Sequence, residues 1–176
     1  MKKYLFFSLF CFLPMLLMGQ EMQFPVIKNG GGIFPVPEAE SIGEWRQPYK
    51  IVTEITAGMD KPDLLNKGLE RIARLVNLYH HSGVLKENID IHVMIHFMAT
   101  SIILTDEAHQ KKFDCLNPNT TLINEMAANG VKFYVCGQSI YRGKMNKEPR
   151  NPNIKVILSA MTGITTLQMK GYTFMP

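Results

Sequence analysis

Hydrophobic and polar positions recur with two different periodicities from Tyr49 to the end of the chain. Short apolar runs rich in β-branched residues are typical of strands, whereas apolar positions three and four residues apart are typical of helices. The runs predict five strands, at Lys50–Thr56, Ile89–Phe97, Val131–Val135, Ile154–Leu158 and Tyr172–Met175. The final strand is the shortest of the five.

Helical patterns fill the intervals between these strands. The first helix is predicted to open at Asp60-Lys61-Pro62-Asp63 and to stop at Gly83, because an acidic cap and an early proline are typical helix starts. Its apolar face consists of Leu65, Leu69, Ile72, Val76 and Tyr79. Further helices are predicted after Thr105-Asp106-Glu107, from Asn117-Pro118 to Asn129-Gly130, and from Ser159 to Gly171. Strands that alternate with helices indicate an α/β fold with a mostly parallel sheet in a three-layer α/β/α arrangement.

The N-terminal segments differ from this domain. Residues 1–19 combine Lys2-Lys3 with an apolar run and end at Gly19, which is the layout of a secretory signal peptide. The run is shorter than the roughly 20 residues of a membrane-spanning helix. Residues 20–48 are rich in proline and glycine and are predicted to be an extended arm or linker. The α/β domain then covers residues 49–176, and we expect a periplasmic protein with no membrane attachment after cleavage.

Composition excludes several classes of protein. Hydrophobic residues make up 46% of the chain and charged residues 19%, which is sufficient for one domain with a real core. The net charge is +4, of which Lys2 and Lys3 contribute two, so charge gives no reason to expect nucleic-acid binding. Only Cys115 and Cys136 lie beyond the signal, which excludes a disulfide-scaffolded miniprotein.

Candidate chemistry collects at one edge of the predicted sheet, since ligands of open α/β sheets bind beyond the carboxyl ends of the strands. Four segments come at predicted strand ends: residues 56–59, His96 with Phe97, Cys136–Ser139, and residues 159–162. The predicted substrate-binding positions there are Gly137, Gln138, Ser139, Ser159 and Met161.

Cys136 is the principal candidate for a catalytic residue. Gly137 permits a tight turn after it, and Ser139 is predicted to cap a helix that starts at Ile140. The N-terminus of a helix stabilises the nucleophilic thiolate form of a nearby cysteine. His96 is the candidate acid, base or hydrogen-bond partner. The alternative is that Cys136 merely packs in the core and that backbone groups satisfy His96.

The remaining candidates give weaker signals. His92 and His96 lie about 13 Å apart along one strand face, too far to share an ion, and no metal site is predicted. Cys115 lies in a polar stretch and is either a second thiol that pairs with Cys136 or an ordinary loop residue. Residues 144–153 form a basic loop that either covers the thiol or is simply solvated.

Several segments together resemble the DsrE/DsrF-like sulfur-relay family: Val131–Ser139, residues 117–119, Asn129-Gly130, Ile95-His96, residues 159–162 and Gly171-Tyr172. The resemblance runs over residues 49–176. It implies a five-stranded parallel sheet and homo-oligomers, commonly trimers or hexamers. It also implies that the cysteine at position 136 carries sulfane sulfur as a persulfide, with no cofactor. The signal peptide and the arm distinguish this chain from the cytoplasmic relay proteins.

Three hypotheses follow for the function. The first is an exported persulfide carrier that uses Cys136 and His96 and has an unknown sulfur donor and acceptor. The second is a non-catalytic oligomeric module that binds a small ligand or a partner, with Cys136 as a packing residue. The third is a redox sensor that forms a Cys115–Cys136 disulfide.

Overall fold

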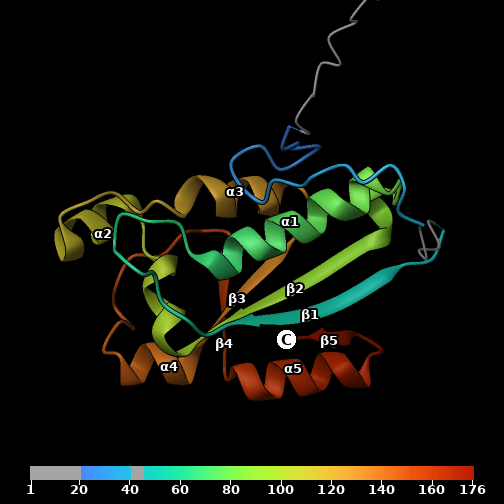
Figure 1. The fold of residues 1–176 in the computed structure, drawn as a ribbon. Coiled ribbons are helices and arrows are strands. Elements are labelled where there is room, and N and C mark those ends of the chain that lie inside the picture. The colour runs from blue at the N-terminus through green and yellow to red at the C-terminus, as the bar shows by residue number, and fades with distance from the viewer. Residues whose placement is uncertain (1–20, 41–45) are drawn as a thin grey trace, which may run out of the picture.

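Five parallel strands form a single sheet in the computed structural model of the chain, which describes residues 21–40 and 46–176 (Figure 1). The predicted signal peptide, residues 1–19, lies outside the described residues. The sheet has the order β4-β3-β2-β1-β5. Its strands are β1 (Tyr49–Ile55), β2 (Ile89–Ile95), β3 (Lys132–Cys136), β4 (Ile154–Ile157) and β5 (Thr173–Met175). All five correspond to predicted strands, and every pairing in the sheet is parallel.

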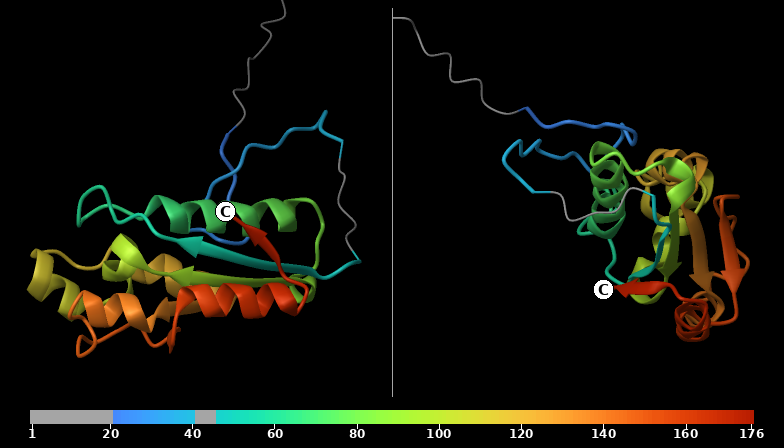
Figure 2. Two further views of the ribbon diagram at one scale, coloured as in Figure 1. Left: turned by 90° about the horizontal axis from the view of Figure 1, so that it is seen from below. Right: turned by 90° about the vertical axis from the view of Figure 1, so that its right-hand side faces the viewer.

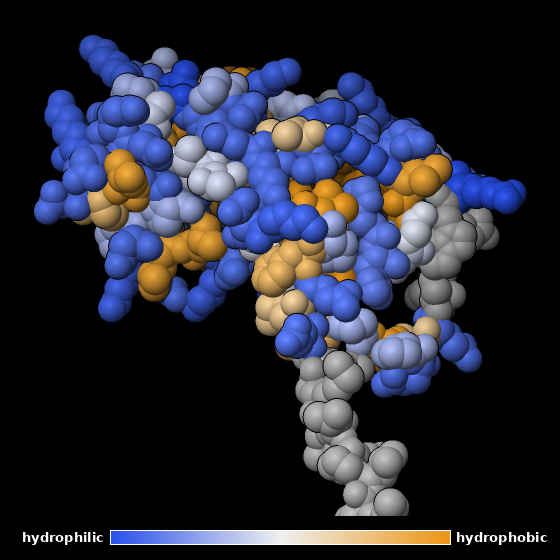
Figure 3. Space-filling model, turned by 90° about the horizontal axis from the view of Figure 1, so that it is seen from above, coloured by the Kyte–Doolittle hydropathy of each residue, from blue (hydrophilic) through white to orange (hydrophobic). Residues whose placement is uncertain are grey.

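Helices cover both faces of the sheet, as the three-layer prediction requires. One side carries α1 and α3, and the other carries α4 and α5 (Figures 1 and 2). The helices are α1 (Lys67–His81), α2 (Asp106–Phe113), α3 (Thr120–Ala128), α4 (Gly137–Arg142) and α5 (Ala160–Met169), with short 3-10 turns η1 (Lys86–Asn88) and η2 (Phe97–Ile103). Figure 3 looks onto the α1 and α3 side, which is mainly hydrophilic with separate hydrophobic patches.

The two sheet faces bury two different cores. Because side chains alternate along a strand, Ile91, Val93 and Ile95 of β2 join the large core with α1 and α3. Met94 instead joins a smaller cluster with Cys136, and α5 covers that cluster. The candidate thiol therefore lies on the α5 side of the sheet.

Helix α1 begins at Lys67, so the prediction that it opens at residues 60–63 is wrong. The Asn66 side chain caps the helix by accepting hydrogen bonds from the N–H groups of Gly68 and Leu69. Asn66 is itself fixed, since its N–H donates to Asn119 Oδ1 at 2.8 Å. The acidic, proline-containing residues 60–63 form a turn before the helix. Asn66 instead accepts hydrogen bonds from the free N–H groups at the helix start.

Other boundaries differ as well: α3 begins at Thr120 with Asn119 as its N-cap, and not at Asn117-Pro118. Two of the differences lie at the candidate site. Strand β2 ends at Ile95 because Phe97 adopts a left-handed conformation (φ 53°) and starts η2, which the sequence pattern did not predict. Helix α4 starts at Gly137 with Cys136 as its N-cap, whereas Ser139 was the predicted cap. The earlier start places the thiol itself at the first turn of the helix.

Residues 21–40 lie along the α1 and α3 layer, where Ile27 and Ile33 are buried. The fully buried Asn77 side chain accepts hydrogen bonds from the N–H groups of Val26 and Ile27. It also donates to the carbonyl groups of Ile27, Gly30 and Gly31. Gly31 has φ +65° and lies against the backbone of α1, where a β-carbon has no room. The glycine run thus serves close packing, and this part of the arm belongs to the folded body.

Candidate functional site

A cavity of about 600 Å³ opens at the carboxyl edge of the sheet. The strand register explains its position: Ile55 pairs with Ile95, Ile95 pairs with Val135, and the strands end together. Residues from several loops and helices complete the walls. The lining comprises Gly58, Met59, Pro62, His96, Phe97, Met98, Thr100, Ser101, Lys112, Phe113, Cys136, Gln138, Ser139, Arg142, Gly143, Met145, Ser159, Ala160 and Met161.

Cys136 lines this cavity with only 5% of its surface exposed. Burial by itself favours the neutral thiol. The backbone N–H of Ala160 and the hydroxyl and N–H of Ser139 oppose that effect by donating to the sulfur. The N–H of Gln138 adds a further bond, and together these donors lower the pKa of Cys136 below its ordinary value. The thiolate is therefore stabilised by groups at the starts of two helices, α4 and α5.

Two neighbours of Cys136 fix the shape of the site. Ser139 Oγ accepts a hydrogen bond from the Phe97 N–H at 3.2 Å, which joins α4 to η2. Gln138 Nε2 donates to the Leu158 carbonyl at 3.3 Å, which joins α4 to the segment after β4. Gly137 is buried, and a β-carbon there would lie 2.9 Å from the Ile157 carbonyl oxygen. Glycine thus lets the β3–α4 turn approach β4.

His96 follows β2 and lines the same cavity. Its Nε2 atom donates to Glu54 Oε2 at 3.0 Å, because a carboxylate oxygen accepts hydrogen bonds. Glu54 lies on β1, and His96 directly follows the neighbouring strand β2. The carboxylate holds the imidazole in one orientation at the cavity wall.

Most of the predicted site residues come together in this cavity. Cys136 and His96 line it with four of the predicted substrate-binding residues, which are Gln138, Ser139, Ser159 and Met161. Gly137 is not among the lining residues and acts in packing. From the basic loop, only Met145 contributes to the lining.

Sequence reasoning missed the walls that η2 and α2 supply. Met98 comes from η2, and Lys112 and Phe113 come from the end of α2. Nothing in their local pattern indicates that α2 returns to the sheet edge. The only available signal was at Phe97 and Met98, two large apolar residues directly after a strand.

Cys115 lies outside the cavity lining, and both Cys115 and Cys136 are free thiols. Cys115 Sγ lies 3.8 Å from His109 Nδ1, and that nitrogen donates to the Cys115 carbonyl at 2.8 Å. The bond fixes the His109 proton on Nδ1 and leaves buried Nε2 without a hydrogen-bond partner. His109 therefore stabilises the turn after α2.

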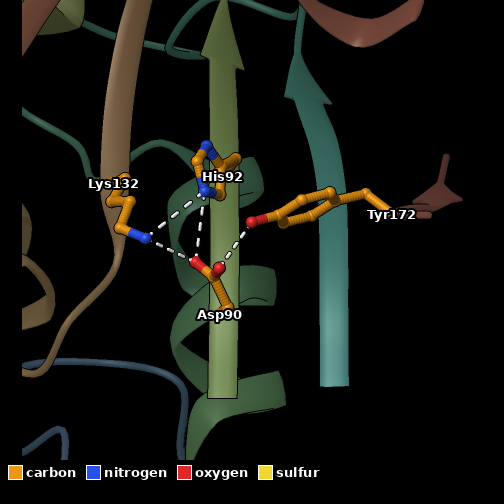
Figure 4. Close-up of polar contacts among 4 residues, drawn as sticks. All are labelled: Asp90, His92, Lys132 and Tyr172. Carbon is orange, nitrogen blue, oxygen red and sulfur yellow. Dashed lines mark hydrogen bonds and ion pairs between the residues drawn. The ribbon is translucent and has the colours of Figure 1, made fainter. Parts of the chain in front are cut away.

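A second polar cluster lies near the opposite end of the sheet, on the same face (Figure 4). Asp90 Oδ1 accepts from Lys132 Nζ at 2.7 Å and lies 3.1 Å from His92 Nε2. Asp90 Oδ2 accepts from the Tyr172 hydroxyl at 2.5 Å. Burial and the bond to Asp90 raise the pKa of Tyr172 to about 12. Burial lowers the pKa of His92, so its ring is neutral at pH 7.

Among residues 21–40 and 46–176, no cluster of three or more histidine, cysteine, aspartate or glutamate side chains is arranged to hold a metal ion. The same part of the chain contains no helix that is long and apolar enough to cross a membrane.

Comparison with solved structures shows the same fold in two other proteins. A protein of unknown function, MTH1491 from Methanobacterium thermoautotrophicum, is 16% identical with a TM-score of 0.52, and the match covers 72% of this chain and 97% of that one. The ychN protein from E. coli is 14% identical with a TM-score of 0.51, and the match covers 72% and 96% of the two chains. No curated protein matches this sequence.

The sequence model of the DsrE/DsrF-like family matches residues 59–176. The matched segment contains four of the five strands, the thiol and nearly all of the cavity wall. The predicted resemblance is thereby confirmed, and the chain belongs to the DsrE/DsrF-like family.

Proposed function

We propose that this protein accepts sulfane sulfur as a persulfide on Cys136 and passes it to an acceptor. Proteins of its family are generally concerned with sulfur relay. The observation that supports the proposal most directly is the environment of the Cys136 thiol. Cys136 lines a cavity and has a pKa lowered by hydrogen-bond donors despite its burial.

The transfer needs a thiolate and no cofactor. The Cys136 thiolate attacks the outer sulfur of a donor R–S–SH, a new sulfur–sulfur bond forms on Cys136, and the donor bond breaks. The donor leaves as the thiolate R–S⁻ with the electron pair of the broken bond. The outer sulfur keeps its proton, so no external oxidant or reductant is consumed. An acceptor thiolate reverses the same exchange on Cys136.

Ser139 and the backbone donors support this chemistry in two ways. They stabilise the attacking thiolate, and they provide N–H groups near the persulfide that forms on Cys136. His96, oriented by Glu54, lines the wall of the same cavity and is the residue that we assign to hydrogen bonding with the bound sulfur.

The test is the intact mass of the reduced protein after incubation with polysulfide. We expect a gain of one sulfur atom that a reductant removes. Cys136→Ser abolishes the gain, whereas Cys115→Ser keeps it. Cys115→Ser is a matched control because it replaces the only other thiol beyond residue 20.

A gain that disappears in both variants would instead support a relay or disulfide between the two thiols. The absence of a gain in every form would refute the proposal. That result would favour the second hypothesis, a non-catalytic binding module, for which the same cavity is the site.

A further inference from the structure

The cavity at Cys136 is much larger than the sulfur it would receive. Its volume of about 600 Å³ falls within the range of pockets that bind small organic molecules, roughly 300–1,000 Å³. A polysulfide ion or a single sulfane sulfur would leave most of that space unfilled. The volume therefore points to a donor whose sulfur is attached to an organic body.

Apolar side chains form much of the wall. Phe97, Met98 and Met161 line the cavity, and each is at least 65% exposed to solvent. Phe97 is held there by a left-handed backbone and by the bond from its N–H to Ser139. Methionine and phenylalanine at such a position favour contact with the apolar part of a ligand.

The charged groups of the wall are of one sign. Lys112 and Arg142 line the cavity, and no aspartate or glutamate does so. Glu54 lies outside the lining and is bound to His96. Within the described ranges, neither Lys112 nor Arg142 forms a salt bridge. Lys112 Nζ lies 5.6 Å from the centroid of the Phe113 ring. Two cations without a carboxylate partner at an apolar pocket fit a ligand with an anionic end.

We infer that the sulfur donor is a small organic persulfide with an apolar body and a carboxylate. Its outer sulfur meets Cys136, its body contacts Phe97, Met98 and Met161, and its carboxylate lies against Lys112 and Arg142. This inference rests on the proposed function, because it identifies the class of donor for the same thiol. The exchange is the one written above, with R as the organic carboxylate.

The experiment compares three donors on the purified protein. They are the persulfide of para-(mercaptomethyl)benzoate, the persulfide of the corresponding neutral carboxamide, and inorganic polysulfide. The rate of persulfide formation at Cys136 is followed by mass spectrometry. We expect the carboxylate to react about fivefold faster than the carboxamide, the advantage of a partly exposed ion pair near the upper limit for such pairs. Added salt should reduce the difference.

The variants separate charge in the cavity from charge elsewhere. Lys112→Gln with Arg142→Gln should remove the preference for the carboxylate over the carboxamide. The matched control is Lys111→Gln with Arg71→Gln, which removes two exposed positive charges outside the lining and should keep the preference. Phe97→Ala should slow both organic donors more than polysulfide.

Two kinds of failure are distinguishable. If polysulfide persulfidates Cys136 but the carboxylate shows no advantage over the carboxamide, the donor class is wrong and the proposed function stands. The same conclusion holds if the control pair removes the preference as fully as the cavity pair. If no donor persulfidates Cys136, the proposed function itself fails.

Discussion

The pKa of Cys136 is lowered by its hydrogen-bond donors. Desolvation at 5% exposure would raise the pKa of an isolated thiol. The N–H groups of Ala160 and Ser139 reverse that effect, with help from the Ser139 hydroxyl. The ionisation of this sulfur therefore depends mainly on the position of backbone N–H groups and not on a mobile charged side chain.

We predict that alkylation of Cys136 persists at pH values below the ordinary thiol pKa of about 8.5. The lowered pKa means that the reactive thiolate is present above the folded-state value and is lost only as the pH falls through it. Ser139→Ala removes one donor, raises the pKa and should slow alkylation at pH 7 by about fivefold. The rate of iodoacetamide labelling, mapped to Cys136 by mass spectrometry across a pH series, measures both effects.

Ser159→Ala is the control for this prediction. Ser159 lines the same cavity, but its side chain is not among the donors that lower the thiol pKa. An unchanged pH profile is expected for it. A profile for Ser139→Ala that coincides with the wild type would show that the hydroxyl does not stabilise the thiolate.

At the scale of elements, one side chain attaches the N-terminal arm to the domain. Asn77 of α1 is fully buried and bonds to the backbone of Val26, Ile27, Gly30 and Gly31. Glu125 of α3 adds bonds from the N–H groups at 28 and 29. The arm is thus tied to two helices that are distant in sequence.

Asn77→Ala should lower the free energy of unfolding by about 3 kcal/mol, because it leaves several buried backbone groups unpaired. It should also make residues 21–40 accessible to proteases. Urea unfolding and limited proteolysis measure the two effects. Arg71→Ala, an exposed change on the same helix, is the control. A small loss that equals the control would mean that water replaces these bonds without cost.

The Asp90 cluster joins three elements: β2, β3 and the segment that leads into β5. Figure 4 shows Tyr172 reaching across β1 to Asp90 on β2. Burial favours the protonated carboxyl, but the bonds from Lys132 and Tyr172 hold the pKa of Asp90 below its ordinary value. The three-residue strand β5 therefore has an anchor besides its pairing with β1.

Tyr172→Phe should lower the free energy of unfolding by about 1–2 kcal/mol at neutral pH, because it removes a hydrogen bond to a charged group. The folded-state pKa of about 12 lies above the ordinary value of tyrosine. The contribution is therefore present below pH 10 and is lost as the pH rises toward 12. Urea unfolding at several pH values tests this. A difference between the two proteins that persists unchanged above pH 11 would contradict the assignment.

At the scale of the whole molecule, β4 is an open edge of the sheet. Val156 on this strand and Leu158 just after it are both exposed, at 43% and 74%. Exposed strand edges with apolar side chains favour association with another chain. We therefore propose that this edge lies at the interface of the homo-oligomer that the family resemblance implies.

Light scattering after size-exclusion chromatography measures the predicted assembly. Leu158→Asp should shift the protein toward monomer, because it places a charge in the proposed interface. Leu85→Asp is the matched control, since Leu85 is a similarly exposed leucine next to η1. A wild-type monomer at micromolar concentration would rule out the assembly.

The sequence by itself determined the order and type of the main helices and strands. It also determined that the candidate site residues lie at the carboxyl edge of the sheet. The strand Ile89–Ile95 could be predicted because its β-branched residues Ile89, Ile91, Val93 and Ile95 recur at every second position and are all buried. The alternation of strands with helices then indicates a parallel sheet. The carboxyl ends of parallel strands necessarily meet, so Cys136 and His96 could be placed together in advance.

Only the tertiary structure decided the residues that complete the site. Lys112 and Phe113 reach the cavity from α2, and the α5 backbone N–H of Ala160 reaches the thiol across the sheet edge. The capping of α1 by Asn66 and the packing of the arm on Asn77 depend in the same way on partners more than 40 residues away. Local sequence patterns indicate which face of a helix or strand is buried. They do not indicate which distant backbone groups a side chain will contact in the folded protein.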